Sequence, residues 1–293
     1  MWNLAMLPIG QICSVARFEL FARRLLCGNQ LGGYVNRRHG SGLEFDELRE
    51  YQVGDDVRAI DWNSSVRTDS ILVKKYREDF NRTVLVLVDG SASLFYGSHG
   101  FLKYNIAAQV AGIIAASAVY NNDAVGLIIY RDDEPVVIRP RSHGSHLPFL
   151  LNILFNYRVH YKLSASLDKV VKHSMAIQKN DSLVIIVSDF LDESYQSALA
   201  TLSRFHEVVA VRIGDVKEKF FHMDACIDLV DSELDVTIPS MTQREGIRVA
   251  EHIAALYGEQ DLFFKRHGIA CFDAVSTTYS WERLVYFLRH RAY

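Results

Sequence analysis

The amino-acid sequence predicts an α/β protein built on a doubly wound, mostly parallel sheet, and three observations lead to that class. From about residue 82 onward, apolar β-branched runs alternate with longer segments of helical periodicity. Two of these runs, 84–88 and 183–187, are continuously apolar, as strands buried on both faces of a parallel sheet are. Both runs end abruptly in polar residues, where the carboxyl edge of such a sheet carries its loops.

The expected elements alternate along the chain because short apolar runs favour strands and longer segments with apolar positions three and four apart favour helices. They are, in order, strand 84–88, helix 103–120, strands 124–130 and 135–139, helices 147–156 and 167–178, strand 183–187, helix 194–205, strands 208–213 and 226–230, helix 243–265, strand 269–275 and helix 281–290. An apolar-periodic segment at 15–26 and a dense polar stretch at 40–67 precede them. We therefore divide the chain into an amino-terminal segment, 1–80, and a sheet domain, 81–293.

Composition excludes several classes of function. The 293 residues are 49% hydrophobic, and 32 Lys and Arg against 35 Asp and Glu give a net charge of −3. Without an excess of positive charge, no nucleic-acid partner is expected. The longest apolar run, 110–119, is shorter than the roughly 18 residues that a membrane span needs, so no integral membrane segment is expected. The four cysteines form no C-x-x-C pair, which favours a reducing, cytoplasmic location.

Oxygen-bearing side chains gather where the two buried strands end. Asp89, Ser91 and Ser93 follow the first strand, and Asp189 follows the second. Because neighbouring parallel strands end at the same edge of a sheet, these side chains are expected to converge, provided that the first loop curls at Gly90. Carboxylates and hydroxyls together suit a hard divalent cation: Mg²⁺, Mn²⁺ or Ca²⁺. The alternative is that these residues only turn the chain and cap the next helix.

The amino-terminal segment interleaves acidic and basic residues. Its candidate partner-binding residues are Arg49, Asp55, Asp56, Arg58, Asp61, Trp62 and Arg67. One interpretation is a charge-paired layer that packs this segment onto the sheet domain, and the other is a binding surface for a partner protein.

A longer motif in this segment is far more specific than the short Asp/Ser pattern. It reads Gly40-x-Gly42-x-Glu44-Phe45, Leu48-Arg49-x-Tyr51, Gly54-Asp55-Asp56-x-Arg58-x-Ile60-Asp61-Trp62, Ser65 and Arg67, and the Asp89-x-Ser91-x-Ser93 tip follows it. From about residue 30 to the carboxyl end, the chain resembles the bacterial family called domain of unknown function 58. Members of this family resemble von Willebrand factor A domains, which implies the same fold for the sheet domain.

The resemblance implies a metal-ion-dependent adhesion site that would hold Mg²⁺, or alternatively Mn²⁺ or Ca²⁺. The first and last motif positions of such a site match Asp89, Ser91, Ser93 and Asp189. The Thr that normally completes it would fall near Ala165, so Ser164 or Ser166 would have to supply the replacing hydroxyl.

The resemblance also implies a partner. Family members are typically encoded beside AAA+ ATPases of the MoxR group and are thought to work with them as substrate adaptors or metal-insertion chaperones. We therefore expect a non-enzymatic protein-interaction module with a MoxR-type ATPase as its partner. Two alternatives stay open: a metal-free scaffold that binds through the Arg- and Asp-rich segment, and a Mg²⁺-dependent phosphoester hydrolase with His99, His143 or His146 as its base.

Overall fold

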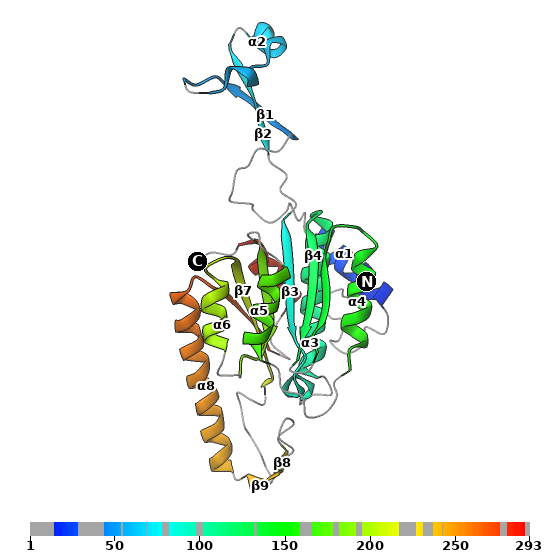
Figure 1. Cartoon of the computed structure of the whole chain (residues 1–293), viewed down its shortest axis with the longest axis vertical. Helices are drawn as coiled ribbons and strands as arrows, with labels where there is room; N and C mark the ends of the chain where they lie inside the picture. Colours follow the sequence, from blue (N-terminus) through cyan, green and yellow to red (C-terminus); the bar gives the residue numbers. More distant parts are fainter. Residues whose placement is uncertain are drawn as a thin grey trace. The chain divides into compact units, whose positions relative to one another are not determined.

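The structure is a computed structural model whose elements are drawn in Figure 1. Its contacts divide the chain into two compact units, Met1–Gly32 with Arg82–Tyr293, and Gly33–Asn81. The structure describes residues 15–28, 44–53, 55–68, 70–77, 82–97, 102–131, 134–158, 166–177, 182–191, 195–216, 227–230, 237–241, 243–275 and 280–290.

A six-stranded sheet forms the centre of the larger unit. Its strands lie in the order β10 (Ala270–Val275), β7 (Glu207–Gly214), β6 (Leu183–Ser188), β3 (Thr83–Asp89), β4 (Ala124–Tyr130) and β5 (Val136–Arg141). Neighbouring strands are parallel except at one edge, where β5 runs antiparallel to β4. Read from β5 and numbered along the chain, this is the doubly wound order 3-2-1-4-5-6. The prediction of a doubly wound, mostly parallel sheet is confirmed.

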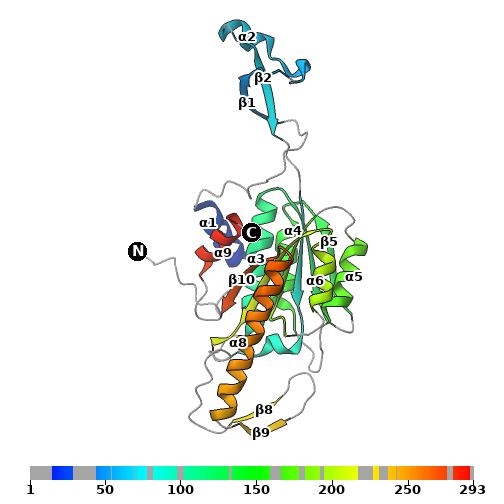
Figure 2. The same ribbon diagram turned by 90° about the vertical axis from the view of Figure 1, so that its left-hand side faces the viewer.

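Helices cover both faces of this sheet (Figure 2). One face packs against α5 (Leu167–Ile177), α6 (Tyr195–Leu202) and the carboxyl half of α8 (Gln243–Arg266). The buried side chains between these helices and the strands include Leu85, Leu87, Val184, Ile186, Val171, Leu199 and Phe264. Burial of these apolar groups on a two-sided sheet is why the strand sequences show no polar alternation.

The other face packs against α3 (Lys103–Tyr120), which contacts β3 and β4. Two more helices, α1 (Val15–Gly28) and α4 (His146–Asn156), pack on α3 from outside. Because α3 lies between the sheet and these helices, it is buried along most of its length. Its sequence is accordingly apolar all round rather than on one stripe.

Helix α1 belongs to the sheet unit, which differs from the division at residue 80. The Phe18 ring meets Phe155 of α4 edge-on with centroids 4.9 Å apart, and Phe21 meets Trp281 of α9 (Trp281–Arg289) at 5.7 Å. The apolar-periodic segment noted at 15–26 coincides with this helix, but the sequence did not indicate the surface on which the helix packs. The larger unit resumes at Arg82, next to the predicted boundary.

The smaller unit is an antiparallel hairpin of β1 (Glu44–Glu50) and β2 (Leu72–Arg77), connected through η1 (Val57–Ala59) and α2 (Trp62–Thr68). The Ser65 hydroxyl donates to the carbonyl of Asp61 at 2.7 Å and accepts from the backbone N–H of Leu72 at 2.8 Å. This hydroxyl therefore attaches α2 to β2. The polar composition of residues 40–67 gave no sign of the hairpin, because its strands lack an alternating apolar face.

The predicted elements after residue 82 agree with the structure to within a few residues, apart from two differences. The helix predicted at 194–205 ends at Leu202, and a turn follows it. The strand expected near 226–230 does not join the central sheet: β8 (Ile227–Val230) pairs with β9 (Thr237–Met241), a strand that was not predicted. Within the described ranges, no helix is both long enough and apolar enough to cross a membrane.

Asp123 is a buried carboxyl group at the amino edge of the sheet, directly before β4. Its Oδ1 accepts a hydrogen bond from the backbone N–H of Arg82 at 2.9 Å. Burial raises the pKa of Asp123 from 3.8 to about 6, although Arg82 opposes the shift. The pKa of Asp123 is higher in the folded than in the unfolded protein, so the protonated carboxyl group favours the folded state. This contribution to the free energy of unfolding is complete below about pH 4 and is lost as the pH rises through about 6.

Replacing Asp123 with Asn should therefore stabilise the protein at neutral pH by about 1 kcal/mol, with no gain near pH 4. The Asn carbonyl can still accept from Arg82, whereas the burial cost of a charge is removed. Urea unfolding of both proteins from about pH 4 to about pH 7 would measure the difference, and a gain that does not change with pH would contradict this explanation.

Candidate functional site

The candidate site lies at the switch point of the sheet, between β3 and β6. The strands that follow β3 in the chain, β4 and β5, lie on one side of this point, and β6, β7 and β10 lie on the other. Ligands of open α/β sheets bind beyond the carboxyl ends of the strands at this point. Val88 of β3 is in register with Val187 of β6, so Asp89 and Ser188 follow side by side. The two polar strand ends predicted from the sequence thus meet at one edge.

Gly90 allows the loop after β3 to curl toward its neighbours. Its N–H donates to the carbonyl of Tyr130 at 2.9 Å, and a Cβ at this position would lie 3.0 Å from that oxygen and 2.6 Å from the Tyr157 hydroxyl. Asp89 completes the curl, because its Oδ1 accepts from the backbone N–H of Ser91 at 2.8 Å. The short η2 helix (Ala92–Phe95) follows.

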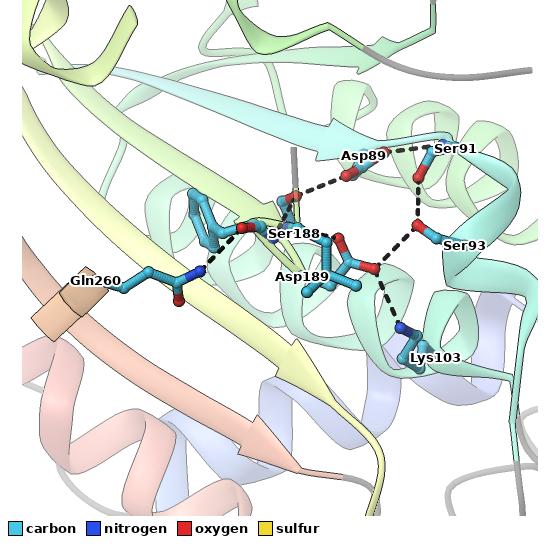
Figure 3. A network of polar contacts seen from close by, with 9 residues as sticks. Asp89, Ser91, Ser93, Lys103, Ser188, Asp189 and Gln260 are labelled. Carbon is cyan, nitrogen blue, oxygen red and sulfur yellow. Dashed lines mark hydrogen bonds and ion pairs between the residues drawn. The ribbon is translucent and has the colours of Figure 1, made fainter. Parts of the chain in front are cut away.

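Serine hydroxyls donate hydrogen bonds to both aspartates of the cluster (Figure 3). On one side, Ser188 Oγ donates to Asp89 Oδ2 at 2.6 Å. On the other side, the hydroxyls of Ser91 and Ser93 lie 2.8 Å apart, and Ser93 Oγ donates to Asp189 Oδ2 at 2.9 Å. The predicted convergence of Asp89, Ser91, Ser93 and Asp189 is present in the structure. Of these four side chains, only Ser93 is not fully buried.

The loop after β6 is held in an uncommon backbone conformation. Phe190 has a φ of 54°, in the left-handed region that non-glycine residues rarely adopt. Its N–H donates to Ser188 Oγ at 3.1 Å, and its carbonyl accepts from Gln260 Nε2 of α8 at 2.9 Å. Its ring is buried against Tyr195 and Phe264. These contacts stabilise the strained residue and thereby the position of Asp189 beside it.

Sequence reasoning missed two members of the cluster, Ser188, whose hydrogen bond to Asp89 is described above, and Lys103. Its Nζ lies 3.1 Å from Asp189 Oδ2, and its side chain is 2% exposed (Figure 3). A usable signal was present, because Lys103 opens a helix that is otherwise almost entirely apolar. A lysine is seldom buried in such surroundings unless a carboxylate pairs with it.

The cluster contains two buried carboxyl groups whose charges affect each other. Burial, and then the charge of Asp189, raise the pKa of Asp89 to about 7, while hydrogen bonds from Ser188 and Ser91 oppose the rise. Burial and the charge of Asp89 also raise the pKa of the neighbouring Tyr130 hydroxyl. The site therefore favours a positive charge beside its carboxylates.

Two further residues, Ser164 and Ser166, were predicted as metal ligands. Ser164 lies outside the described residues. Ser166 is half-buried at the position before α5, and its membership of the cluster stays a prediction. In the part of the chain that the structure describes, no group of three or more His, Cys, Asp or Glu side chains is placed to hold a metal.

In the smaller unit, several predicted partner-binding residues bond within the unit itself. Arg49 pairs with Asp55 at 2.6 Å, and hydrogen bonds from Gln52 and Arg49 lower the pKa of the Asp55 carboxyl. Asp56 caps η1 by accepting from the N–H of Arg58 at 2.9 Å.

Asp61 is also used inside the smaller unit. It accepts from Ser64 Oγ at 3.0 Å and lies 3.5 Å from Lys74 Nζ. Trp62, by contrast, is 65% exposed, and the side chains of Arg58 and Arg67 are exposed too. The charge pairs of Arg49, Asp55 and Asp61 described here lie within this unit. Of the predicted partner-binding residues, the exposed ones are Asp56, Arg58, Trp62 and Arg67.

The histidines considered as bases for a hydrolase lie away from the aspartates. His146 Nε2 bonds to the carbonyl of Val125, near the start of β4, whereas Asp89 pairs with Tyr130 at the other end of that strand. Burial lowers the pKa of His146, as is typical of a neutral structural histidine. His143 contacts Ser145 in the turn before His146, and His99 lies outside the described residues. Neither His143 nor His146 is therefore placed to act as a base at this site.

The fold and the cluster define the class of this protein: a doubly wound α/β domain with a buried carboxylate and hydroxyl cluster at its switch point. The chain belongs to the family described as Protein of unknown function DUF58, which matches residues 47–260. The resemblance found in the sequence motif is thus confirmed at the level of the family.

Relatives in two mycobacteria are similar to this chain. An uncharacterized protein of Mycobacterium tuberculosis strain H37Rv, Rv1480, is 26% identical over 206 residues, which cover 68% of this chain and 64% of that protein. The uncharacterized protein Mb1516 of Mycobacterium bovis matches with the same values. The chain therefore spans less than two thirds of the length of these relatives.

Two solved structures are similar to parts of this chain. An aerotolerance-related membrane protein from Bacteroides fragilis is 11% identical, with a TM-score of 0.40 over 58% of this chain and 87% of that one. The SpRpn10 VWA domain is 10% identical, with a TM-score of 0.38 over 70% of this chain and 94% of that one.

Proposed function

We propose that this protein is a non-enzymatic interaction module, an adaptor or chaperone partner of a MoxR-type AAA+ ATPase, which binds its partner at the carboxyl edge of the sheet. One observation carries the proposal: the cluster fixes two loops at the switch point, and each loop carries an exposed apolar side chain. Tyr96, after η2, and Leu191, after Phe190, are both 44% exposed. Rigid, partly exposed aromatic and aliphatic residues are typical anchors of protein interfaces.

The hydrogen bonds explain why these two loops would act together. Asp89 and Asp189 are 5% and 4% exposed, so a partner would touch the loops more than the carboxylates. Ser93 joins the first loop to the second through Asp189, which limits their relative movement. Binding would therefore cost little ordering entropy. The choice of a MoxR-type ATPase is supported by the family resemblance alone.

The test is a binding measurement between the purified protein and the MoxR-type ATPase of the same cell. Leu191→Asp and Tyr96→Asp should each weaken binding by at least about tenfold, because a charge would enter an apolar contact. Phe205→Asp is the matched control: Phe205 is 60% exposed, but it precedes β7 at the opposite edge of the sheet. If Leu191→Asp and Tyr96→Asp both bind with full affinity, the proposed binding surface is wrong.

A further variant separates this surface from the smaller unit. Trp62→Ala removes an exposed aromatic side chain of that unit, and under the present proposal it leaves the affinity unchanged. If Trp62→Ala abolishes binding while Leu191→Asp does not, the contact belongs to the Arg- and Asp-rich segment instead. Both outcomes can be read from the same titration.

A further inference from the structure

The switch-point cluster already contains a cation, the ammonium group of Lys103. Lys103 is the first residue of α3, and its backbone N–H donates to the carbonyl of Tyr96 at 2.8 Å. Its side chain is 2% exposed and that of Asp189 is 5% exposed, so their contact is shielded from solvent. A lysine buried this deeply stays charged only if a carboxylate compensates for its lost hydration. The fold thus places a positive charge against the second carboxylate of the site.

The hydrogen-bond pattern of the cluster does not fit a divalent ion bound through Asp189 Oδ2. That oxygen accepts from both Ser93 Oγ and Lys103 Nζ, which uses its two lone pairs. The Ser91 and Ser93 hydroxyls, which would also have to face the ion, are bonded to each other.

The first carboxylate is engaged as well. Both oxygens of Asp89 accept hydrogen bonds, one from Ser91 N and one from Ser188 Oγ. Mg²⁺ needs near-octahedral oxygen coordination and gives up its waters reluctantly, so an ion bound through Asp189 Oδ2 and the two serine hydroxyls would have to displace the partners that these atoms already have.

We propose that Lys103 is the built-in cation of this site and supplies, in place of Mg²⁺, the positive charge beside Asp189, the carboxylate to which Ser93 links the first loop. Because the ammonium is part of the chain, the loops after β3 and β6 keep their positions without a dissociable ion. Chelators and the Mg²⁺ concentration would then have no effect on the positions of these two loops. This inference concerns which charge stabilises the cluster, and it does not depend on which protein the two loops bind.

The first measurement uses the full chain without substitution. Titration with Mn²⁺, followed by electron paramagnetic resonance, should show no saturable binding. The thermal unfolding midpoint should be equal, within about 1 °C, in EDTA and in millimolar Mg²⁺, because a ligand that does not bind cannot shift it. Saturable uptake of Mn²⁺ that Asp189→Asn abolishes would overturn the inference.

The second measurement exchanges the cation. Lys103→Met retains much of the side-chain volume but leaves the carboxylates without the ammonium, so its unfolding midpoint should fall by about 5 °C or more. Mg²⁺ should raise the midpoint of this variant selectively, because the ion can now enter the space beside Asp189. Lys103→Arg, which keeps the charge, should recover part of the loss and respond to no metal.

Lys172→Met is the matched control, since Lys172 pairs with Asp168 on the exposed surface of α5. It should behave as the unsubstituted protein does. An unchanged midpoint in Lys103→Met, or an equal loss in Lys103→Arg and Lys103→Met, would overturn the inference. If Lys103→Met does not fold, the Mn²⁺ titration of the unsubstituted chain still decides it. Neither measurement involves a partner, so the proposed binding function stands or fails separately.

Discussion

Replacing Arg212 with Leu is expected to lower the free energy of unfolding by about 3 kcal/mol, the largest loss predicted here. The Arg212 side chain in β7 is 4% exposed, and its guanidinium donates to Asp273 at 2.7 Å, Gln260 at 3.0 Å and Asp261 at 3.1 Å. It also lies 4.2 Å above the ring of Tyr257. The substitution would remove all of these contacts and leave the buried Gln260 carbonyl without this donor.

Urea unfolding would measure this loss, and Arg212→Lys is the informative control. A lysine keeps the charge but cannot present the planar fork of donors that reaches β10 and α8 together. It should therefore recover less than half of the loss. A lysine variant as stable as the unsubstituted protein would show that charge alone matters at this position.

Replacing Gly112 with Ala should cost about 2 kcal/mol. Gly112 lies where α3 contacts α1 and α4, and an added Cβ would be 2.6 Å from Phe18 and 2.9 Å from Leu151. Both neighbours are packed in the core, so the methyl group would force α1 away from α3. The gain of about 1 kcal/mol in helix propensity is too small to offset this strain.

Gly258→Ala provides the comparison for that measurement. Gly258 lies within α8, where an added Cβ would meet no atom within 4 Å. The same substitution should stabilise the protein there by roughly 0.5–1 kcal/mol. Thermal unfolding of both variants should give shifts of opposite sign, and destabilisation by both would show that packing on α1 is not the cause.

Much of the fold followed from two physical patterns in the sequence. Continuous apolar runs predicted the buried strands β3 and β6, and the polar residues after them predicted where Asp89 and Asp189 would meet. These features are local in sequence, because burial on two faces leaves its mark on consecutive residues. The convergence of Asp89 and Asp189 needed only the further assumption that the two strands are neighbours, whereas the bond between Ser188 and Asp89 depends on their register and was not predicted.

Other parts of the structure depend on contacts between distant residues. The sequence did not reveal that α1 packs on α3, because its apolar stripe fits any apolar surface. Lys103 was overlooked because its partner, Asp189, lies 86 positions away. The hairpin of the smaller unit was missed because its sequence shows no apolar alternation, and contacts such as those of Ser65 and Asp55 join residues that are apart in the sequence.

The register of the hairpin has a consequence for how this chain could be altered. Glu44 at the start of β1 lies opposite Arg77 at the end of β2, so the first and last strand residues of the smaller unit are adjacent. A module with neighbouring entry and exit points can be cut out and replaced by a short bridge, or transplanted into a surface turn of another protein, with little cost in loop closure.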